Sequence, residues 1–188
     1  MKKPIKILFA DSDGACFNCV RLQKEWIGKQ TGTEEEKHEK FRKEFCEYTE
    51  LVFPEMAARV TRIVEETGCK IIWSSTWRIL SKYSNKDDAE RMFNRRGLPG
   101  KALIGYTPFL GIDKTRGEEI AAAVKLFNSG GYTFNKDMEY EIVKAAVVDD
   151  DTFAGYGLPS CCQLFRTYED YGMTEKITNK VINYLGGD

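Results

Sequence analysis

The sequence predicts an α/β protein whose fold is a three-layer, doubly wound parallel sheet. Five apolar runs of strand length occur along the chain, and segments with helix start and stop signals lie between most of them. The first run, which contains Ile7, Leu8, Phe9 and Ala10, is apolar at consecutive positions. Such runs are typical of parallel strands that are covered on both faces. A chain of 188 residues can bury a substantial core, so we expect one domain over residues 1–188.

Residues that typically begin or end helices support the predicted helices. Pro54 suits the first turn of a helix, and Gly68 and Gly97 suit the ends of the helices that precede them. Thr174 is a suitable N-cap for the last helix. In chain order, we expect strands at 5–10, 69–78, 101–107, 142–151 and 161–167, and helices at 33–50, 54–67, 87–96, 115–129 and 174–187.

One helix is surplus to a simple alternation of strands and helices. Residues 33–50 are highly charged, with Phe41, Phe45 and Tyr48 at helical spacing, and they precede a second helix before the next strand. A crossover between parallel strands needs only one helix. We therefore expect residues from about 16 to 52 to form a small helical cap insertion.

The composition excludes several classes of protein. The formal net charge is −1, so no overall charge attracts nucleic acid or an anionic membrane, and any anion site must be local. No apolar run approaches the length of a membrane span, and acids interrupt the apolar stretch near the N-terminus. We expect a cytoplasmic protein with no membrane partner and no obligate protein partner. Its six cysteines are then expected to be reduced and mostly buried.

Acids and hydroxyls follow three of the predicted strands. Because parallel strands end at the same edge of the sheet, we expect these side chains to lie together there. Several carboxylates in one crevice need a cation, and hard oxygen ligands without histidine favour Mg²⁺. A hydroxyl and a basic side chain beside that ion would complete a phosphate site. The residues in question are Asp11 and Asp13, then Ser74, Ser75 and Thr76, and then Asp149, Asp150 and Asp151.

The order of these motifs resembles the haloacid dehalogenase-like (HAD) phosphohydrolase superfamily. The match consists of "DSDG", a strand ending in "WSSTWR", "KTRGEEI" and "VVDDD", and it extends over nearly the whole chain. The details are similar to small HAD domains associated with RNA-repair proteins. The resemblance implies a Rossmannoid HAD-like fold and a Mg²⁺-dependent phosphatase that acts through an aspartyl-phosphate intermediate. It departs from the usual pattern at Ser12, where most relatives carry an apolar residue.

The resemblance also implies roles for the two acids of the first motif. Asp11 would be the nucleophile, and Asp13 would serve as general acid and base. A separation of two residues along an extended chain places both side chains on one side. Gly14 would let the chain turn sharply away and would contribute to the phosphate site.

The remaining roles carry over with some alternatives open. Ser75 best matches the hydroxyl that binds a phosphoryl oxygen, with Ser74 as the alternative and Thr76 beside them. The basic residue is Arg116, with Lys114 as the alternative. Asp150 aligns with the acid that binds Mg²⁺, and Asp149 or Asp151 would support it. The predicted metal set is Asp11, Asp13 through its backbone carbonyl, Asp149 and Asp150.

The expected substrate is a phosphomonoester, such as a nucleotide or a nucleic-acid end. Two alternatives remain open from the sequence. The first is a non-catalytic HAD-fold scaffold for binding or repair, and the second is a phosphotransferase that uses the same two aspartates. The presence of both Asp11 and Asp13 favours a catalytic protein, because a scaffold has no need of an acid and base at that spacing.

Overall fold

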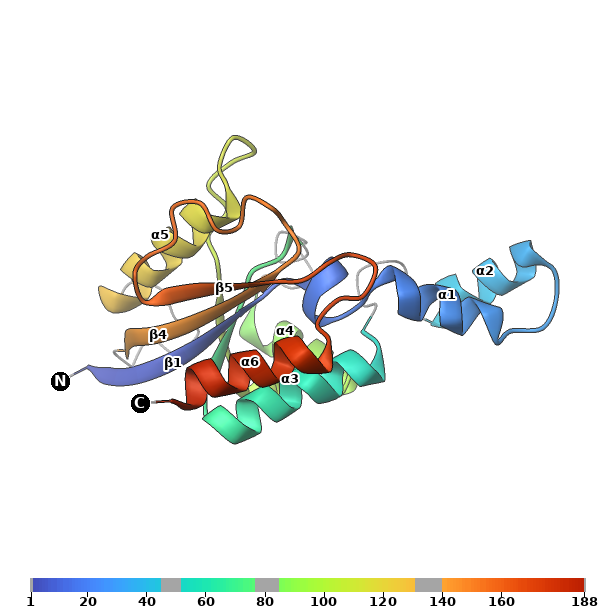
Figure 1. The fold of residues 1–188 in the computed structure, drawn as a ribbon, viewed down its shortest axis with the longest axis horizontal. Helices are drawn as coiled ribbons and strands as arrows, with labels where there is room; N and C mark the ends of the chain where they lie inside the picture. Colours follow the sequence, from blue (N-terminus) through green and yellow to red (C-terminus); the bar gives the residue numbers. More distant parts are fainter. Residues whose placement is uncertain (1, 45–51, 77–84, 131–139, 188) are drawn as a thin grey trace.

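The structure is an α/β fold built on one five-stranded sheet (Figure 1). The computed structural model describes residues 2–44, 52–76, 85–130 and 140–187. The strand order is β3-β2-β1-β4-β5, and all neighbouring strands pair in parallel. The fold class predicted from the sequence is therefore confirmed. The strands are β1 (Lys3–Ala10), β2 (Lys70–Trp73), β3 (Leu103–Tyr106), β4 (Tyr140–Asp149) and β5 (Cys162–Arg166).

Helices cover both faces of the sheet and form the outer two layers (Figure 1). Because side chains alternate along a strand, β1 sends Leu8 and Ala10 into one core and Ile7 and Phe9 into the other. This alternation explains why β1 is apolar at consecutive positions. The first core lies under α3 (Pro54–Thr67), α4 (Lys86–Arg95) and α6 (Glu175–Gly186), and the second lies under α5 (Arg116–Asn128).

The ends of the helices follow the signals in the sequence. Pro54 is the first residue of α3, and Gly68 ends it in the left-handed conformation with φ of 67°. At the start of α5, the Glu118 N–H donates to the Thr115 hydroxyl over 3.2 Å. In return, the Thr115 N–H donates to the Glu118 carboxylate over 2.8 Å. This capping box fixes the first turn of α5 and so positions Arg116, its first residue.

The link between β4 and β5 contains no helix, although the whole link, residues 150–161, lies in the described part of the chain. It packs instead against the start of α5. A Cβ atom added at Gly117 would lie 1.8 Å from the carbonyl oxygen of Tyr156. Glycine at this position therefore allows the backbone of the link to approach α5 closely.

Two helices lie between β1 and α3, where the sequence predicts a cap. They are α1 (Val20–Gly28) and α2 (Glu34–Glu44), and they project beyond one end of the sheet (Figure 1). Trp26 and Phe41 join them, with ring centroids 5.5 Å apart. The sequence predicted a helix at 33–50 but did not predict α1. The structure shows α2 within that range, and residues 45–50 of the predicted helix lie outside the described part. The role of this region as a cap remains a prediction.

Candidate active site

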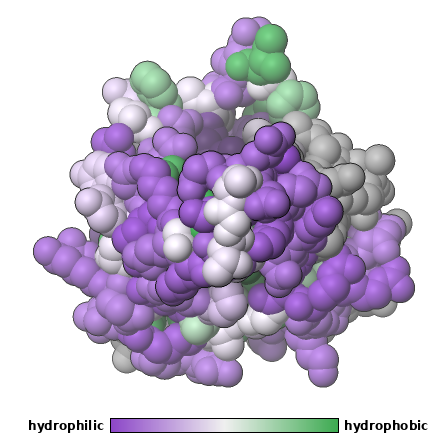
Figure 2. All heavy atoms as spheres, turned by 90° about the vertical axis from the view of Figure 1, so that its right-hand side faces the viewer, coloured by the Kyte–Doolittle hydropathy of each residue, from purple (hydrophilic) through white to green (hydrophobic). Residues whose placement is uncertain are grey.

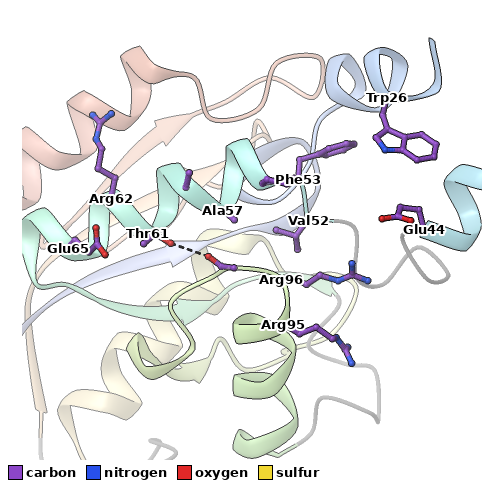
Figure 3. Close-up of a pocket in the computed structure, with 13 residues that line it drawn as sticks. Trp26, Glu44, Val52, Phe53, Ala57, Thr61, Arg62, Glu65, Arg95 and Arg96 are labelled. Carbon is purple, nitrogen blue, oxygen red and sulfur yellow. Dashed lines mark hydrogen bonds between the residues drawn. The ribbon is translucent and has the colours of Figure 1, made fainter. Parts of the chain in front are cut away.

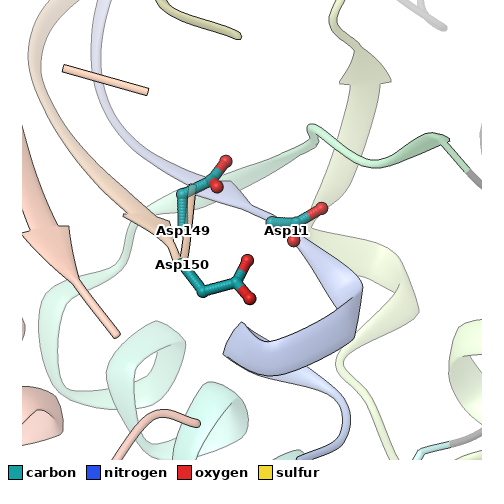
Figure 4. A group of neighbouring side chains, drawn as sticks. All are labelled: Asp11, Asp149 and Asp150. Atoms are coloured by element: carbon teal, nitrogen blue, oxygen red, sulfur yellow. The ribbon is translucent and has the colours of Figure 1, made fainter. Parts of the chain in front are cut away.

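Three carboxylates meet where β1 and β4 end (Figure 4). Asp11 follows β1 directly, and its N–H donates to the Val148 carbonyl over 3.1 Å. Asp149 is the last residue of β4, and Asp150 follows it. One oxygen from each of the three carboxylates lies within 4.8 Å of the others. The chain order reverses between these two central strands, which is the place where open α/β sheets bind their ligands.

The carboxylates of this acid cluster disfavour one another's charge. Burial raises the pKa of Asp11 well above its ordinary value, and the neighbouring Asp149 raises it further while Arg116 opposes the rise. Burial also raises the pKa of Asp149 to about 6. The pKa of Asp150 is raised as well, first by burial. Three acids with raised pKa values form a site that a bound cation would stabilise in its ionised form.

Arg116 is the basic side chain that reaches this cluster. Its Nη2 lies 3.8 Å from Asp11 Oδ1, and its Nε lies 3.5 Å from Asp149 Oδ2. Its Nη1 donates to Glu119 Oε2 over 3.1 Å, which fixes the guanidinium from the side of α5. Lys114, the alternative from the sequence, is exposed and pairs with Glu118 Oε1 at 2.9 Å. Of the two candidates, only Arg116 lies at the acids.

The acid cluster has spare ligand capacity. Oδ2 of Asp149 is buried and accepts no hydrogen bond within the described part of the chain. Among the described residues, the guanidinium of Arg116 by itself cannot neutralise three neighbouring carboxylates. A small group of hard oxygen donors with a buried, unsatisfied oxygen suits Mg²⁺.

Asp13 and Gly14 form the turn that follows Asp11. The Asp13 side chain is exposed and accepts a hydrogen bond from Asn18 Nδ2 over 2.7 Å, so it lies outside the three-carboxylate group. Gly14 has φ of 62°, and a Cβ atom there would lie 2.2 Å from Asp150 Oδ2. Its carbonyl accepts a hydrogen bond from the Thr167 hydroxyl over 2.9 Å. Gly14 thus allows the turn and leaves room for the Asp150 carboxylate.

The hydroxyls after β2 lie beside the end of β1. The Ser74 N–H donates to the Ala10 carbonyl over 2.9 Å, and the Thr107 hydroxyl lies 3.4 Å from the Ser74 hydroxyl. Ser74 and Ser75 are both buried, whereas Thr76 is exposed. The two serines are therefore next to the acid-bearing strand end, and the choice between them as phosphate ligand stays open.

Asp151 lies outside the three-carboxylate group. Its carboxylate accepts a hydrogen bond from the Phe153 N–H over 2.9 Å, and its side chain is exposed. Its own N–H donates to Asp149 Oδ1 over 2.9 Å. Asp151 thus orients Asp149 through its backbone, while Asp149 and Asp150 are the acids of this strand end that face Asp11.

Ser12 supports the site in a way that the sequence did not predict. It is fully buried between the two acids of the first motif, and its hydroxyl accepts a hydrogen bond from Trp73 Nε1 over 2.8 Å. Trp73 itself is fully buried. The signal for the Ser12 contact was the polar residue at a usually apolar position.

Replacing Ser12 by Ala is expected to lower the free energy of unfolding by about 1–3 kcal/mol, because the buried indole N–H loses its acceptor. Denaturant unfolding followed by tryptophan fluorescence would measure the loss. The matched control is Ser160→Ala, which removes an exposed hydroxyl. Equal stabilities for the two variants would show that the Trp73 contact contributes nothing.

One cavity lies away from the acids. It has a volume of about 860 Å³ and lies between α1, the end of α2, the length of α3 and the end of α4 (Figure 3). Trp26, Phe53 and Arg96 line it, and the Thr61 hydroxyl donates to the Gly97 carbonyl at one side over 3.3 Å. None of its lining residues belongs to the acid cluster, so its size does not make it the catalytic centre.

An acid at the end of β1 lies next to acids at the end of the neighbouring parallel strand β4. This arrangement is the one expected of the HAD-fold hydrolases. A family model described as the HAD domain in Swiss Army Knife RNA repair proteins matches residues 7–177. The chain belongs to this family. The match confirms the resemblance seen in the motifs, including the resemblance to HAD domains of RNA-repair proteins. No curated protein and no solved structure matches the chain. Within its described residues, no helix is long and apolar enough to cross a membrane.

Proposed function

We propose that the protein is a Mg²⁺-dependent phosphatase that hydrolyses a phosphomonoester through an aspartyl-phosphate intermediate. The observation that carries the proposal is the meeting of Asp11, Asp149 and Asp150 beside Arg116. Asp11, Asp149 and Asp150 would hold Mg²⁺, which would supply positive charge to the phosphoryl oxygens. The backbone carbonyl of Asp13 is the further ligand that the family suggests.

The residues of the site divide the reaction into two steps. In the first, an Asp11 carboxylate oxygen attacks phosphorus, the bond to the leaving oxygen breaks, and Asp13 donates a proton to that oxygen. In the second, Asp13 removes a proton from water as the water oxygen attacks phosphorus. The bond between phosphorus and Asp11 then breaks, which releases inorganic phosphate and restores both carboxyl groups.

The other residues would bind and orient the phosphoryl group. Arg116 supplies a fixed positive charge next to Asp11. Ser75 or Ser74 would donate a hydrogen bond to a phosphoryl oxygen from the end of β2. Asp13 is exposed, as a group that must meet a leaving group and then water should be. The proposed substrates are nucleotides, nucleic-acid ends or other phosphomonoesters, and the proposed setting is the cytoplasm.

Phosphate release from p-nitrophenyl phosphate tests this function. We expect turnover that saturates with added Mg²⁺, falls to background with excess chelator and returns when Mg²⁺ is restored. Activity that resists the chelator would contradict the proposed role of the acid cluster. If Mg²⁺ binds but no phosphomonoester is hydrolysed, the scaffold alternative replaces the phosphatase. Phosphate transfer to an added alcohol in preference to water would indicate a phosphotransferase.

A further inference from the structure

Large aromatic side chains stand exposed on the loops that follow β4 and β5. Phe153 and Tyr156 are 57% and 63% exposed, and Tyr168 is 62% exposed. We call these three residues the aromatic rim. Isolated exposed apolar residues are common, but three aromatic rings on two adjacent strand-end loops form a local group.

The aromatic rim is tied to the acid cluster by backbone contacts. The Phe153 N–H donates to the Asp151 carboxylate, and the Asp151 N–H in turn donates to Asp149 Oδ1. The carbonyl of Tyr156 lies against Gly117, the residue after Arg116. Tyr168 follows Thr167, whose N–H donates to the Asp149 carbonyl over 3.0 Å. Each ring is therefore carried by a segment that contacts the site itself.

The arrangement of the rings leaves surface for a ligand. The Phe153 and Tyr156 rings lie 5.7 Å apart at an interplanar angle of 32°, and both remain more than half exposed. Arg166 connects the two loops, since its Nη2 donates to the hydroxyl of Thr152, the residue before Phe153, over 2.9 Å. Its guanidinium lies 5.5 Å from the centre of the Tyr168 ring. The rim thus combines flat apolar surfaces with a cation.

The loop between β3 and α5 carries a second group of exposed apolar side chains. Phe109, Leu110 and Ile112 are exposed there, and the Leu110 N–H donates to the carboxylate of Glu119 over 3.3 Å. Glu119 is the partner of Arg116, so this loop also borders the site. The loop stands at the top of Figure 1, and the most hydrophobic atoms of the largely hydrophilic face in Figure 2 gather at the top.

We propose that the aromatic rim binds the unpaired terminal base of a single-stranded nucleic acid whose end phosphate lies at the acid cluster. The inference rests on the proposed function and narrows its substrate class. Bases stack on Tyr and Phe rings whatever their sequence, and Arg166 would meet the next backbone phosphate. A duplex end keeps its bases stacked in the helix and cannot use the rings. A small sugar phosphate has no flat aromatic base to stack on them.

The occupant is a nucleic acid rather than a phosphopeptide for two reasons. A cation lies on the rim next to the rings, where a polyanion offers a second phosphate and a peptide with one phosphate does not. The family to which the chain belongs is found in RNA repair proteins. The overall charge of −1 gives no general attraction, so binding would depend on these local contacts.

A thermodynamic cycle on binding tests the inference without turnover. The protein is the full chain with Asp11→Asn, and the probes are fluorescent single-stranded RNAs with a 5′- or a 3′-phosphate, with or without the base of the phosphorylated terminal nucleotide. One of the two RNAs, with its phosphate at the 5′ or the 3′ end, should bind. For that RNA, removal of the terminal base should weaken its binding to the protein with the intact aromatic rim about tenfold. In the Phe153→Ala/Tyr156→Ala background, the same removal should change the dissociation constant less than about twofold.

The control variant is Val143→Ala. Val143 is also exposed, but it lies on β4 six residues before Asp149, which is about 20 Å along an extended strand. It should leave the tenfold effect of the base unchanged.

Three results would overturn the inference. These are no binding of either RNA, an equal effect of the base with and without the rim, or a rim-dependent affinity for a phosphotyrosine peptide but not for RNA. Failure of the phosphatase proposal is a separate result, since it would show as no phosphate release from any phosphomonoester by the wild-type chain. If the protein released no phosphate but the base still strengthened RNA binding only with the aromatic rim intact, the binding site would stand without the phosphatase activity.

Discussion

Replacing Asp11 by Asn is expected to lower phosphate release by about 10³-fold or more while the fold becomes more stable in the absence of Mg²⁺. The amide cannot form the aspartyl-phosphate, so turnover is lost. The stability rises because Asp11 is buried and repelled by Asp149, two effects that disfavour its charged form. Phosphate release and thermal unfolding of the same preparation would measure both changes.

The matched control for this variant is Asp151→Asn. It makes the same chemical change two residues after Asp149, on an exposed carboxylate outside the three-carboxylate group. Its turnover should stay close to that of the wild type. If Asp11→Asn retained comparable activity, Asp11 could not be the nucleophile. If it lost activity together with its cooperative unfolding, the loss would reflect misfolding and not chemistry.

The second large effect is a dependence of stability on pH that Mg²⁺ should suppress. The Asp149 carboxyl has a pKa of about 6 in the native protein against an ordinary value of 3.8. The native state therefore binds more protons between these values than the unfolded state does. Stability from this group is fully present below the lower value and is lost as the pH rises through about 6. The loss amounts to about 3 kcal/mol.

Denaturant unfolding from about pH 4 to pH 8 would measure this loss in the metal-free protein. Other groups also titrate in this range, so the quantity of interest is the difference between the wild type and Asp149→Asn. The variant should lack the loss of stability between pH 3.8 and about 6. Saturating Mg²⁺ should restore stability at high pH in the wild type but much less in the variant. Parallel pH profiles for the two proteins would contradict the raised pKa.

The sequence predicted the sheet well because its signals are local. Each strand is a short apolar run, and Pro54, Gly68 and Thr174 mark helix ends by backbone chemistry that needs no partner from elsewhere. The helix α1 was missed because it is only 9 residues long and buries only Leu22, so it offers few apolar positions from which to recognise a helix. The helix-free link from β4 to β5 was not predicted to pack on α5, because Gly117 reveals that contact only in three dimensions.

The candidate site could be predicted in its acids but not in its detail. The position of Asp11 and Asp149 follows from the rule that parallel strands end together. The choice between Arg116 and Lys114 required the structure, because the two residues lie at the start of the same helix. Arg116 contacts the acids, whereas Lys114 pairs with Glu118. Likewise, the hydrogen bond that Ser12 accepts joins residues far apart in the sequence, and no local pattern specifies it.

The placement of the acid cluster has a consequence for local opening of the molecule. Asp11 and Asp149 end the two central strands, which are paired from Lys3 and Tyr140 to Ala10 and Val148. Such strands exchange their amide protons only when the whole domain unfolds. The helix α2 buries no side chain and can open alone at little cost. The helix α2 can therefore fluctuate through many openings while the carboxylates keep their positions.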